Sequence, residues 1–310
     1  MTIYEIEPSR ENLHGPFSRD RPAVLTIDSG DAVCFRTLDA GWGIEPYDES
    51  GERRQFTPRD EEIDRGHALC GPIAIRGARK GMTLAIHVDD LRVGTWGWTR
   101  AGGWSSPVND RLGVTGDHHL LRWTLDPDAM VGRDQHGHEV TLRPFMGVMG
   151  MPPDEPGFHP TSPPRSCGGN IDCKELVAGT TLYLPIPVDG GLFSVGDGHA
   201  AQGDGEVSTT AIECPVDRVQ LSFTVRDDLR LTTPRARVDG AWLTLGFHED
   251  LDEATMLALD GMLDLIQEQY GVGRLEALGL ASVVVDLRVT QIVNGVRGVH
   301  AVLADGAIRR

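Results

Sequence analysis

Short apolar runs separated by turn-forming residues fill most of the first 230 residues, and this pattern constrains the fold more than any other feature. Clusters of Gly, Pro and Asp interrupt the runs and leave little room for long helices. The clearest runs cover residues 23–27, 83–88, 181–184 and 218–223. We expect strands there and, from them, a mainly β (α+β) protein with a sandwich-like or barrel-like core.

The spacing of apolar residues changes in the last quarter of the chain. From Leu251 to Ile266 they recur every three or four positions, which predicts a helix with one buried face. Asp250, with Glu253 three residues later, is a candidate N-cap, and Gly271 is a candidate terminator. The β-branched run at 282–289 predicts a return to strand.

These elements predict how the chain is organised. Residues 1–230 are expected to form a β-rich core, and residues 231–310 to pack on it as a helix with strands. The two parts could also form one single domain. Six prolines between residues 152 and 164 exclude a regular hydrogen-bond ladder there. We expect residues 147–171 to form a long ordered loop, and such loops are often functional.

The charge balance narrows the choice of partners. The 310 residues include 29 Lys and Arg against 46 Asp and Glu, a formal net charge of −17, which repels nucleic acid and anionic lipid. We find no signal peptide and no apolar run near the length of about 20 residues that a membrane span needs. The five cysteines are scattered and lack a CxxC pair, so reduced thiols in a cytoplasmic protein are expected.

Acidic residues and glycines are concentrated between residues 168 and 213, and this density is the strongest functional feature of the sequence. The polar residues concerned are Asp172, Asp189, Asp197, His199, Asp204, Glu206 and Glu213. In an extended segment Asp197 and His199 point to the same side, and Gly198 lets another group approach the backbone. One imidazole with several carboxylates and no thiolate suits zinc, manganese or another divalent ion, or calcium where oxygens dominate.

Two other interpretations of this segment stay open. Gly-rich loops can bind phosphate through backbone N–H groups, but these acids would repel it, and no Lys or Arg lies between Lys174 and Arg218. The simpler alternative is a set of tight β turns with acidic tips. A metal or acid/base site requires the acidic side chains to converge, whereas a set of tight turns does not require this.

Three motifs in this segment resemble the acetamidase/formamidase family in their order and spacing. They are Gly168–Asp172 (GGNID), Val188–Glu206 (VDGGLFSVGDGHAAQGDGE) and Ala211–Glu213 (AIE). The resemblance extends more loosely to Arg143–Gly147 and to Ser282–Gly295. It implies a β-rich, metal-binding hydrolase, with zinc as the first expectation, that cleaves a short neutral amide such as formamide or acetamide. It also implies a homo-oligomer of two or more copies.

Within this resemblance, the acids and the histidine acquire candidate roles at a metal. A cation that polarises the amide carbonyl, or supplies hydroxide near neutral pH, lowers the barrier by several kcal/mol. His199 and Asp197 are the first candidate ligands. Asp172 and Glu213 are candidates to complete the shell or to orient its ligands. Asp89, at the end of an apolar run, is a secondary candidate, because a strand of this kind in the family presents an Asp toward the site.

Other residues of the same motifs are candidates for catalysis and substrate binding. Glu206, with Asp204 close by, is expected to take a proton from water and deliver it to the departing ammonia. Asn170 and Gln202 are neutral and could bind the substrate amide. Two alternatives stay open: a hydrolase of another small amide or of a lactam within the family, and a non-catalytic oligomeric protein stabilised by a structural ion.

Two features depart from this scheme. Many relatives carry a His before the paired glycines, where this chain has Ser166 and Cys167, so the pocket for the amide could differ. Cys173–Glu175 contains the Cys, Lys and Glu of another amidase chemistry. On a strand, however, Cys173 and Glu175 face one way and Lys174 the other, which disfavours a thiol mechanism.

Overall fold

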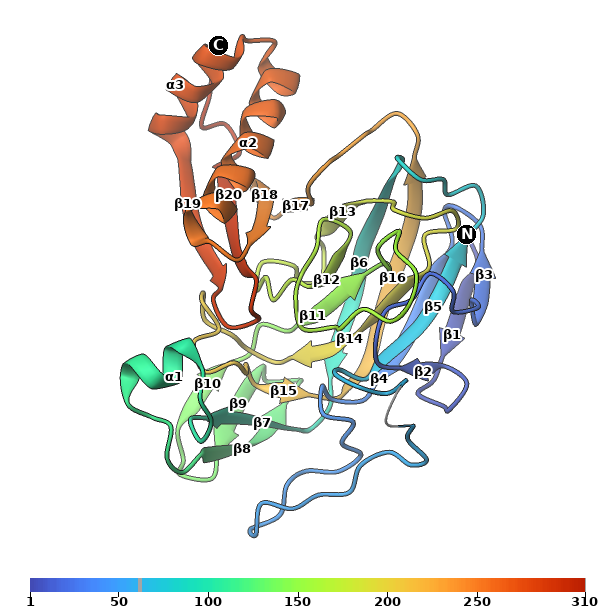
Figure 1. The fold of residues 1–310 in the computed structure, drawn as a ribbon, viewed down its shortest axis with the longest axis vertical. Helices are drawn as coiled ribbons and strands as arrows, with labels where there is room; N and C mark the ends of the chain where they lie inside the picture. Colours follow the sequence, from blue (N-terminus) through green and yellow to red (C-terminus); the bar gives the residue numbers. More distant parts are fainter. Residues whose placement is uncertain (61–62, 310) are drawn as a thin grey trace.

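Two large β-sheets dominate the computed structural model, which describes residues 1–60 and 63–309 (Figure 1). One sheet has nine strands and runs through both the N-terminal and the C-terminal parts of the chain. In spatial order its strands are β1 (Ile3–Ile6), β4 (Ala32–Thr37), β16 (Val216–Arg226), β6 (Thr83–Val93), β13 (Thr181–Pro185), β17 (Arg235–Val238), β18 (Ala241–His248), β20 (Arg297–Ala304) and β19 (Val285–Gln291).

The second sheet has eleven strands and carries the acidic segment. Eight of them follow one path, β10 (Glu139–Thr141), β9 (Val131–Asp134), β8 (His119–Asp126), β7 (Trp96–Ala101), β15 (Glu213–Cys214), β14 (Phe193–His199), β11 (Phe145–Gly150) and β12 (Gly168–Asn170). Off this path, β5 (Leu69–Ile75) pairs with β14 and with β2 (Leu13–His14) and β3 (Leu25–Ile27). All seven residues of β14 are buried, so this strand lies in the interior.

The prediction of a mainly β protein with a C-terminal helical addition is confirmed. Each of the four apolar runs contains a strand, and buried side chains of both sheets form one large hydrophobic core. A smaller hydrophobic cluster joins the C-terminal helices to β18 and β20. The division of the chain at residue 230 stays a prediction, because β17 to β20 continue the nine-stranded sheet while packing on their own cluster.

The predicted C-terminal helix is present as α2 (Leu251–Tyr270). The Asp250 carboxylate accepts hydrogen bonds from the backbone N–H groups of Asp252 and Glu253, as an N-cap does. Gly271 ends the helix with a φ of 63°, a left-handed conformation that glycine adopts without steric cost. Both end signals of this helix are therefore confirmed.

Two local predictions need correction. Residues 282–284 belong to the helix α3 (Arg274–Val284), which precedes the strand β19. Ala277 and Ala281, four residues apart, are buried against α2, and this packing outweighs the β preference of the valines. The long loop covers only residues 151–167, since Gly150 and Gly168 pair across β11 and β12. The prolines lie inside that shorter loop, where they interrupt no ladder. Within residues 1–60 and 63–309 the remaining helix is the short α1 (Pro107–Leu112).

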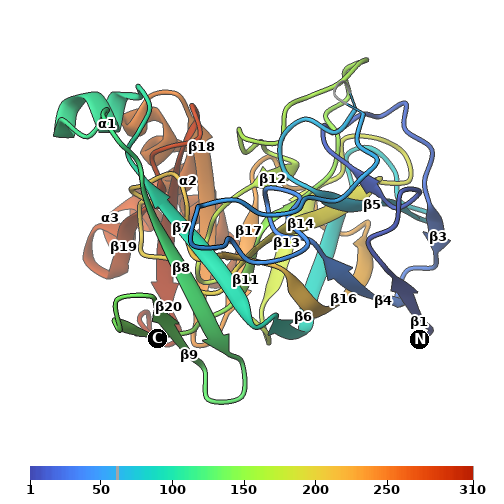
Figure 2. The same cartoon turned by 90° about the horizontal axis from the view of Figure 1, so that it is seen from below.

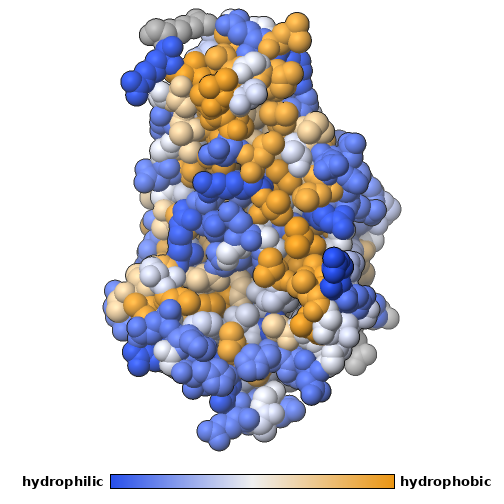
Figure 3. Space-filling view, turned by 90° about the vertical axis from the view of Figure 1, so that its left-hand side faces the viewer, coloured by the Kyte–Doolittle hydropathy of each residue, from blue (hydrophilic) through white to orange (hydrophobic). Residues whose placement is uncertain are grey.

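The surface of the C-terminal part is notably apolar. Seen from below, β1 and the C-terminal helices lie on opposite sides of the molecule (Figure 2). In Figure 3, apolar residues gather over the upper part of the face, where the C-terminal helices lie. Leu275 and Val283 of α3 are 87% and 82% exposed. An exposed apolar face of this kind is typical of a contact surface between proteins, so it favours the expected homo-oligomer, which stays a prediction.

Among the described residues, no helix has the length and apolarity needed to cross a membrane.

Candidate active site and metal centre

Five of the candidate residues converge in the interior of the eleven-stranded sheet. Asp172, Asp197 and His199 offer ligand atoms that all lie within 4.8 Å of one another, and so do His199, Glu206 and Glu213. All five side chains are buried. A buried group of four carboxylates around one imidazole is costly without a counter-charge, which distinguishes it from acidic turns on a surface.

Strand pairing brings these residues together. Asp197 and His199 belong to β14, and the register of β14 with β15 sets Glu213 directly opposite His199. Asp172 follows β12, which pairs with β11, and β11 in turn pairs with β14. The His199 Nε2 lies 3.3 Å from both Asp197 Oδ1 and Glu213 Oε2. Asp197 and His199 thus lie together, as their spacing in the sequence predicts.

Three of the acids adopt a backbone conformation that side chains rarely take. The φ angles of Asp172, Asp197 and Glu206 are 51°, 60° and 45°. The left-handed region is uncommon for residues other than glycine, and holding a residue there costs about 1–3 kcal/mol. Such conformations cluster at functional sites, because the surrounding fold fixes them to direct a side chain.

Gln202 determines which nitrogen of His199 is free. The Gln202 amide donates a hydrogen bond from Nε2 to the Asp172 carbonyl (2.8 Å), so its Oε1 is the atom that faces His199 Nδ1 (2.9 Å). Since Oε1 can only accept, Nδ1 carries the proton and Nε2 holds the lone pair in the neutral ring. Gln202 therefore orients His199, and its predicted part in substrate binding stays a prediction.

The unsatisfied atoms of the cluster fit a cation. Asp172 Oδ1, His199 Nε2, Glu206 Oε2 and Glu213 Oε2 are buried and have no hydrogen-bond partner. Buried polar atoms are nearly always paired, so four in one place indicate a missing positive partner. One nitrogen and several carboxylate oxygens, without sulfur, are a suitable ligand set for zinc or manganese.

Gly147 leaves room in the middle of the cluster. It lies on β11 opposite Asp197, and a Cβ at this position would lie 2.5 Å from Asp197 Oδ2, 2.8 Å from Asp172 Oδ1 and 2.9 Å from His199 Cε1. Its φ is not positive, so its backbone does not require glycine. The lack of a side chain here instead preserves space between the three candidate ligands.

We expect Gly147→Ala to weaken metal binding without unfolding the protein. The added methyl group must displace Asp197 or Asp172, and overpacking of this kind costs about 1–3 kcal/mol, or about 5- to 150-fold in affinity. Zn²⁺ titration of chelator-treated protein measures the loss. Gly116→Ala is the matched control, because a Cβ there has no atom within 4 Å. Equal Zn²⁺ affinities of the two variants would contradict the placement of the ion.

Burial dominates the electrostatics of the cluster. It raises the pKa of Glu213 to about 8, of Asp172 to about 6 and of Glu206 well above its ordinary value. Burial alone would lower the pKa of His199, but the nearby carboxylates of Glu213 and Asp197 raise it well above its ordinary value. Burial alone would likewise raise the pKa of Asp197, but the charge of the His199 ring lowers it. The cluster thus retains protons that a divalent cation would displace.

Glu206 connects the cluster to open space. It lines a cavity of about 300 Å³ together with Gln202 and Asp204, and side chains such as Trp123 and Val140 form part of its wall. Its ligand atom also lies within 4.8 Å of those of His199 and Glu213. Glu206 is therefore placed to act on a molecule in the cavity next to the candidate metal position.

The other predicted residues lie outside the buried cluster. Asp204 lines the cavity but pairs with Lys174 (3.1 Å), and its side chain is 33% exposed. Asp89 lies on β6 of the nine-stranded sheet, is exposed and accepts a hydrogen bond from Ser222. Asn170 is buried on β12 with an unpaired Oδ1, close in sequence to Asp172. Roles for these three residues stay predictions.

The Cys–Lys–Glu segment shows no arrangement for thiol chemistry. Cys173 is fully buried, and burial raises the pKa of its thiol to about 12, which keeps it protonated. Lys174 pairs with Asp204, and Glu175 pairs with Arg143 (2.5 Å). The lysine and the glutamate are therefore engaged elsewhere.

Two residues near the cluster were not identified from the sequence. Asn294 Nδ2 donates a hydrogen bond to Asp172 Oδ2 (2.5 Å), although Asn294-Gly295 has the composition of an ordinary turn. His67 precedes Ala68, whose carbonyl packs against Gly196, the residue before Asp197 on β14. Asn294 lies in the loosely matching segment Ser282–Gly295 and His67 outside every quoted motif, and neither residue type at its position indicates a role by itself.

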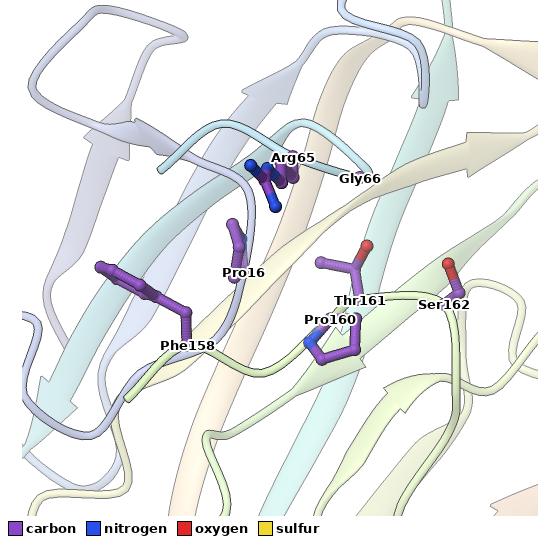
Figure 4. Close-up of a pocket in the computed structure, with 7 residues that line it drawn as sticks. All are labelled: Pro16, Arg65, Gly66, Phe158, Pro160, Thr161 and Ser162. Atoms are coloured by element: carbon purple, nitrogen blue, oxygen red, sulfur yellow. The ribbon is translucent and has the colours of Figure 1, made fainter. Parts of the chain in front are cut away.

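A separate cavity of about 540 Å³ lies beside His67. Figure 4 shows its lining residues, which are Pro16, Arg65, Gly66, Phe158, Pro160, Thr161 and Ser162. Thr161 Oγ1 accepts a hydrogen bond from the backbone N–H of His67 and lies 2.8 Å from its Nδ1. None of the predicted site residues lines this cavity, so the smaller cavity at Glu206 is the candidate substrate pocket.

Comparison with known proteins identifies the family. The model of the acetamidase/formamidase family matches residues 4–159 and 157–237. The chain belongs to this family. The resemblance in the three motifs is therefore confirmed, and every member of the buried cluster lies within the matched residues. Residues 238–310 of this acetamidase/formamidase family member, which include Asn294, lie beyond them.

Individual relatives agree with this assignment. The chain is 46% identical over 255 residues to an acetamidase of Mycolicibacterium smegmatis, covering 63% of this chain and 61% of that protein. It is 26% identical over 250 residues to a formamidase of Methylophilus methylotrophus, covering 63% of this chain and 60% of that one. The matched region thus spans about 60% of the length of these curated relatives.

Solved structures share the fold over nearly the whole chain. An acetamidase from Bacillus halodurans superposes with a TM-score of 0.82 at 29% identity, covering 96% of this chain and 97% of that one. An acetamidase from Yersinia enterocolitica gives a TM-score of 0.85 at 24% identity, with coverage of 99% and 93%. A gamma lactamase from Delftia acidovorans, at 18% identity and a TM-score of 0.65, shares the fold only, over 100% of this chain and 94% of that one.

Proposed function

We propose that this member of the family is a metal-dependent hydrolase that cleaves a short-chain amide, of the formamide or acetamide type, to a carboxylate and ammonia. The observation that carries the proposal is the position of Glu206, which belongs to the buried ligand cluster and also lines the open cavity. A structural ion site would not need an acid with access to a cavity. The five free cysteines favour a cytoplasmic enzyme.

The residues that would hold the metal are His199, Asp197, Asp172 and Glu213. When bound, a divalent cation, with zinc as the first expectation, polarises a carbonyl and lowers the pKa of water. Gln202 holds the His199 ring with Nε2 toward the other ligands. The backbone N–H of Ala211 donates to Glu213 Oε1 (2.9 Å) and leaves Oε2 free for the ion. His199 and Glu213 are thus each fixed by a second contact.

Glu206 is the proposed acid/base. Hydrolysis transfers one oxygen from water to the acyl carbon and breaks the C–N bond, and the departing nitrogen must gain a proton. A carboxylate at the cavity wall can take a proton from the attacking water and give it to that nitrogen. Burial raises the pKa of Glu206, which favours a carboxylate that holds the proton between the two transfers.

The cavity limits the substrate to a small molecule. Its volume is about 300 Å³, and its wall includes Trp123, Val140 and Ile212, with Asp204 and Thr210 at polar positions. Apolar walls with a few polar groups suit a neutral amide with a short acyl chain. A small lactam also fits this description, so a panel of substrates has to distinguish the two.

The wild-type protein provides the direct test. We expect purified protein to contain a divalent metal by elemental analysis and to release ammonia from formamide, acetamide or propionamide. Removal of the metal by a chelator is expected to abolish ammonia release, and adding back Zn²⁺ or Mn²⁺ to restore it. Hydrolysis of a γ-lactam alone would favour the lactamase alternative. Bound metal without turnover of any of these compounds would favour a structural ion.

A further inference from the structure

The turn between β19 and β20 reaches the active site from the C-terminal part of the chain. We call residues 292–296 the hairpin tip. β19 and β20 pair along the edge of the nine-stranded sheet, whereas the ligand cluster lies in the eleven-stranded sheet. The tip therefore joins the two sheets at the site. It lies beyond the residues that the family model matches, which end at residue 237.

Asn294 is the residue of the tip that touches the cluster. Its Nδ2 donates a hydrogen bond of 2.5 Å to Asp172 Oδ2, across a sequence separation of 122 residues. This contact occupies one carboxylate oxygen and leaves Oδ1, which is buried and unpaired, for the ion. Asp172 is held in the left-handed region, so its orientation depends on such contacts.

Gln291 fixes the conformation of the tip. Its side chain is fully buried, and its Nε2 donates to the carbonyl of Val296 (2.7 Å). Its Oε1 accepts from the backbone N–H groups of Val293 (2.9 Å) and Asn294 (3.2 Å). One side chain thus closes the turn from both sides and presents Asn294 in one orientation.

The tip also holds the loop that carries Glu206. The backbone N–H of Gly205 donates to the carbonyl of Thr290 (3.0 Å), and that of Ile292 donates to the carbonyl of Gly205 (3.1 Å). These two bonds form a parallel bridge between Gly205 and Gln291. The residue adjacent to the proposed acid/base is thereby tied to the same hairpin that orients Asp172.

Hydrogen bonds, rather than packing on its outer side, fix the position of the hairpin tip. Ile292, Val293 and Gly295 border a cavity of about 540 Å³, which extends to Val207 and to α1. Since no dense core supports the tip from this side, its position depends on the hydrogen bonds to Gly205, Asp172 and Gln291.

We propose that Asn294 is a positioning residue for Asp172, and that the hairpin tip completes the metal site built by the matched region. This inference rests on the proposed metal site, but the binding of the metal tests it independently of amide turnover. Partners that orient metal ligands typically contribute about 10- to 100-fold in metal affinity or activity.

Asn294→Ala and Asn294→Asp test the proposal, with Val293→Ala as the matched control from the same tip. The measurement is Zn²⁺ titration of chelator-treated full-length protein at pH 8, followed by kcat and KM on the best amide. We expect Asn294→Ala to lose about 10- to 100-fold in Zn²⁺ affinity and to lower kcat more than it raises KM. Val293→Ala is expected to keep the wild-type affinity.

Asn294→Asp separates orientation from mere packing. It has nearly the same shape as Asn but places a carboxylate against Asp172, so we expect at least the loss seen for Asn294→Ala. Wild-type Zn²⁺ affinity in either Asn294 variant, or no Zn²⁺ binding by the wild-type protein, would overturn the proposal. If no amide is hydrolysed but Asn294→Ala still loses Zn²⁺ affinity, the positioning role stands and only the proposed reaction fails.

Discussion

Replacing His199 with Ala is expected to remove both the bound metal and the ammonia-releasing activity. His199 is the one nitrogen donor of both ligand groups, and its Nε2 is buried, unpaired and 3.3 Å from two carboxylates. Without it, four buried carboxylates lose the ring that separates them. Because the metal is asked to supply several kcal/mol, activity should fall by at least about 10³-fold. Elemental analysis and ammonia release measure the two losses.

His87→Ala is the matched control for this variant. His87 lies on β6 in the other sheet, is partly exposed and makes a 2.9 Å hydrogen bond with Thr181. We expect it to keep metal and activity. Thermal unfolding of both variants checks that they fold. Retention of metal and full turnover by folded His199→Ala would contradict the metal site at its centre.

The nitrogen donor also bears on the identity of the ion. Calcium, magnesium and manganese suit carboxylate and other oxygen ligands, whereas imidazole suits zinc and other transition metals. The cluster contains one imidazole and four carboxylates, so zinc is the first expectation and manganese the second. Calcium requires that His199 remain outside the coordination sphere, which the orientation of its ring by Gln202 disfavours.

Much of the fold follows from local sequence signals. The strands at 83–88 and 218–223 were predictable because apolar runs ended at turn residues, and α2 because both its periodicity and its caps agreed. α3 was not, since its apolar face is short and ends in valines that favour strands. Its helical state depends on burial of Ala277 and Ala281 against α2, which no local signal contains.

The same distinction holds for the site. Asp197 and His199 are two residues apart on one strand, so their convergence could be predicted from the period of a strand. Gly147 and Asn294 could not be found in this way, because they reach the cluster through the pairing of β11 with β14 and through the hairpin tip. Sheet register over such separations is a property of the whole fold.

Replacing Glu206 with Gln is expected to keep the metal and to lower kcat by about 10²- to 10⁴-fold, the usual contribution of general acid–base catalysis. Gln keeps the shape of the side chain but can neither take a proton from water nor return one to the leaving nitrogen. Glu206 is the acid that combines burial in the cluster with access to the 300 Å³ cavity. Metal content and kcat on the best amide, measured in the same preparation, test both halves of this prediction.

Asp204→Asn provides the comparison that decides between the two acids of this loop. Asp204 lines the same cavity, but it pairs with Lys174, its side chain is 33% exposed, and it lies outside the buried ligand groups that include Glu206. A smaller loss in Asp204→Asn than in Glu206→Gln is therefore expected. The opposite order would transfer the acid/base role to Asp204. Loss of metal from Glu206→Gln would instead make Glu206 a ligand, since Glu206, His199 and Glu213 already lie close enough to share an ion.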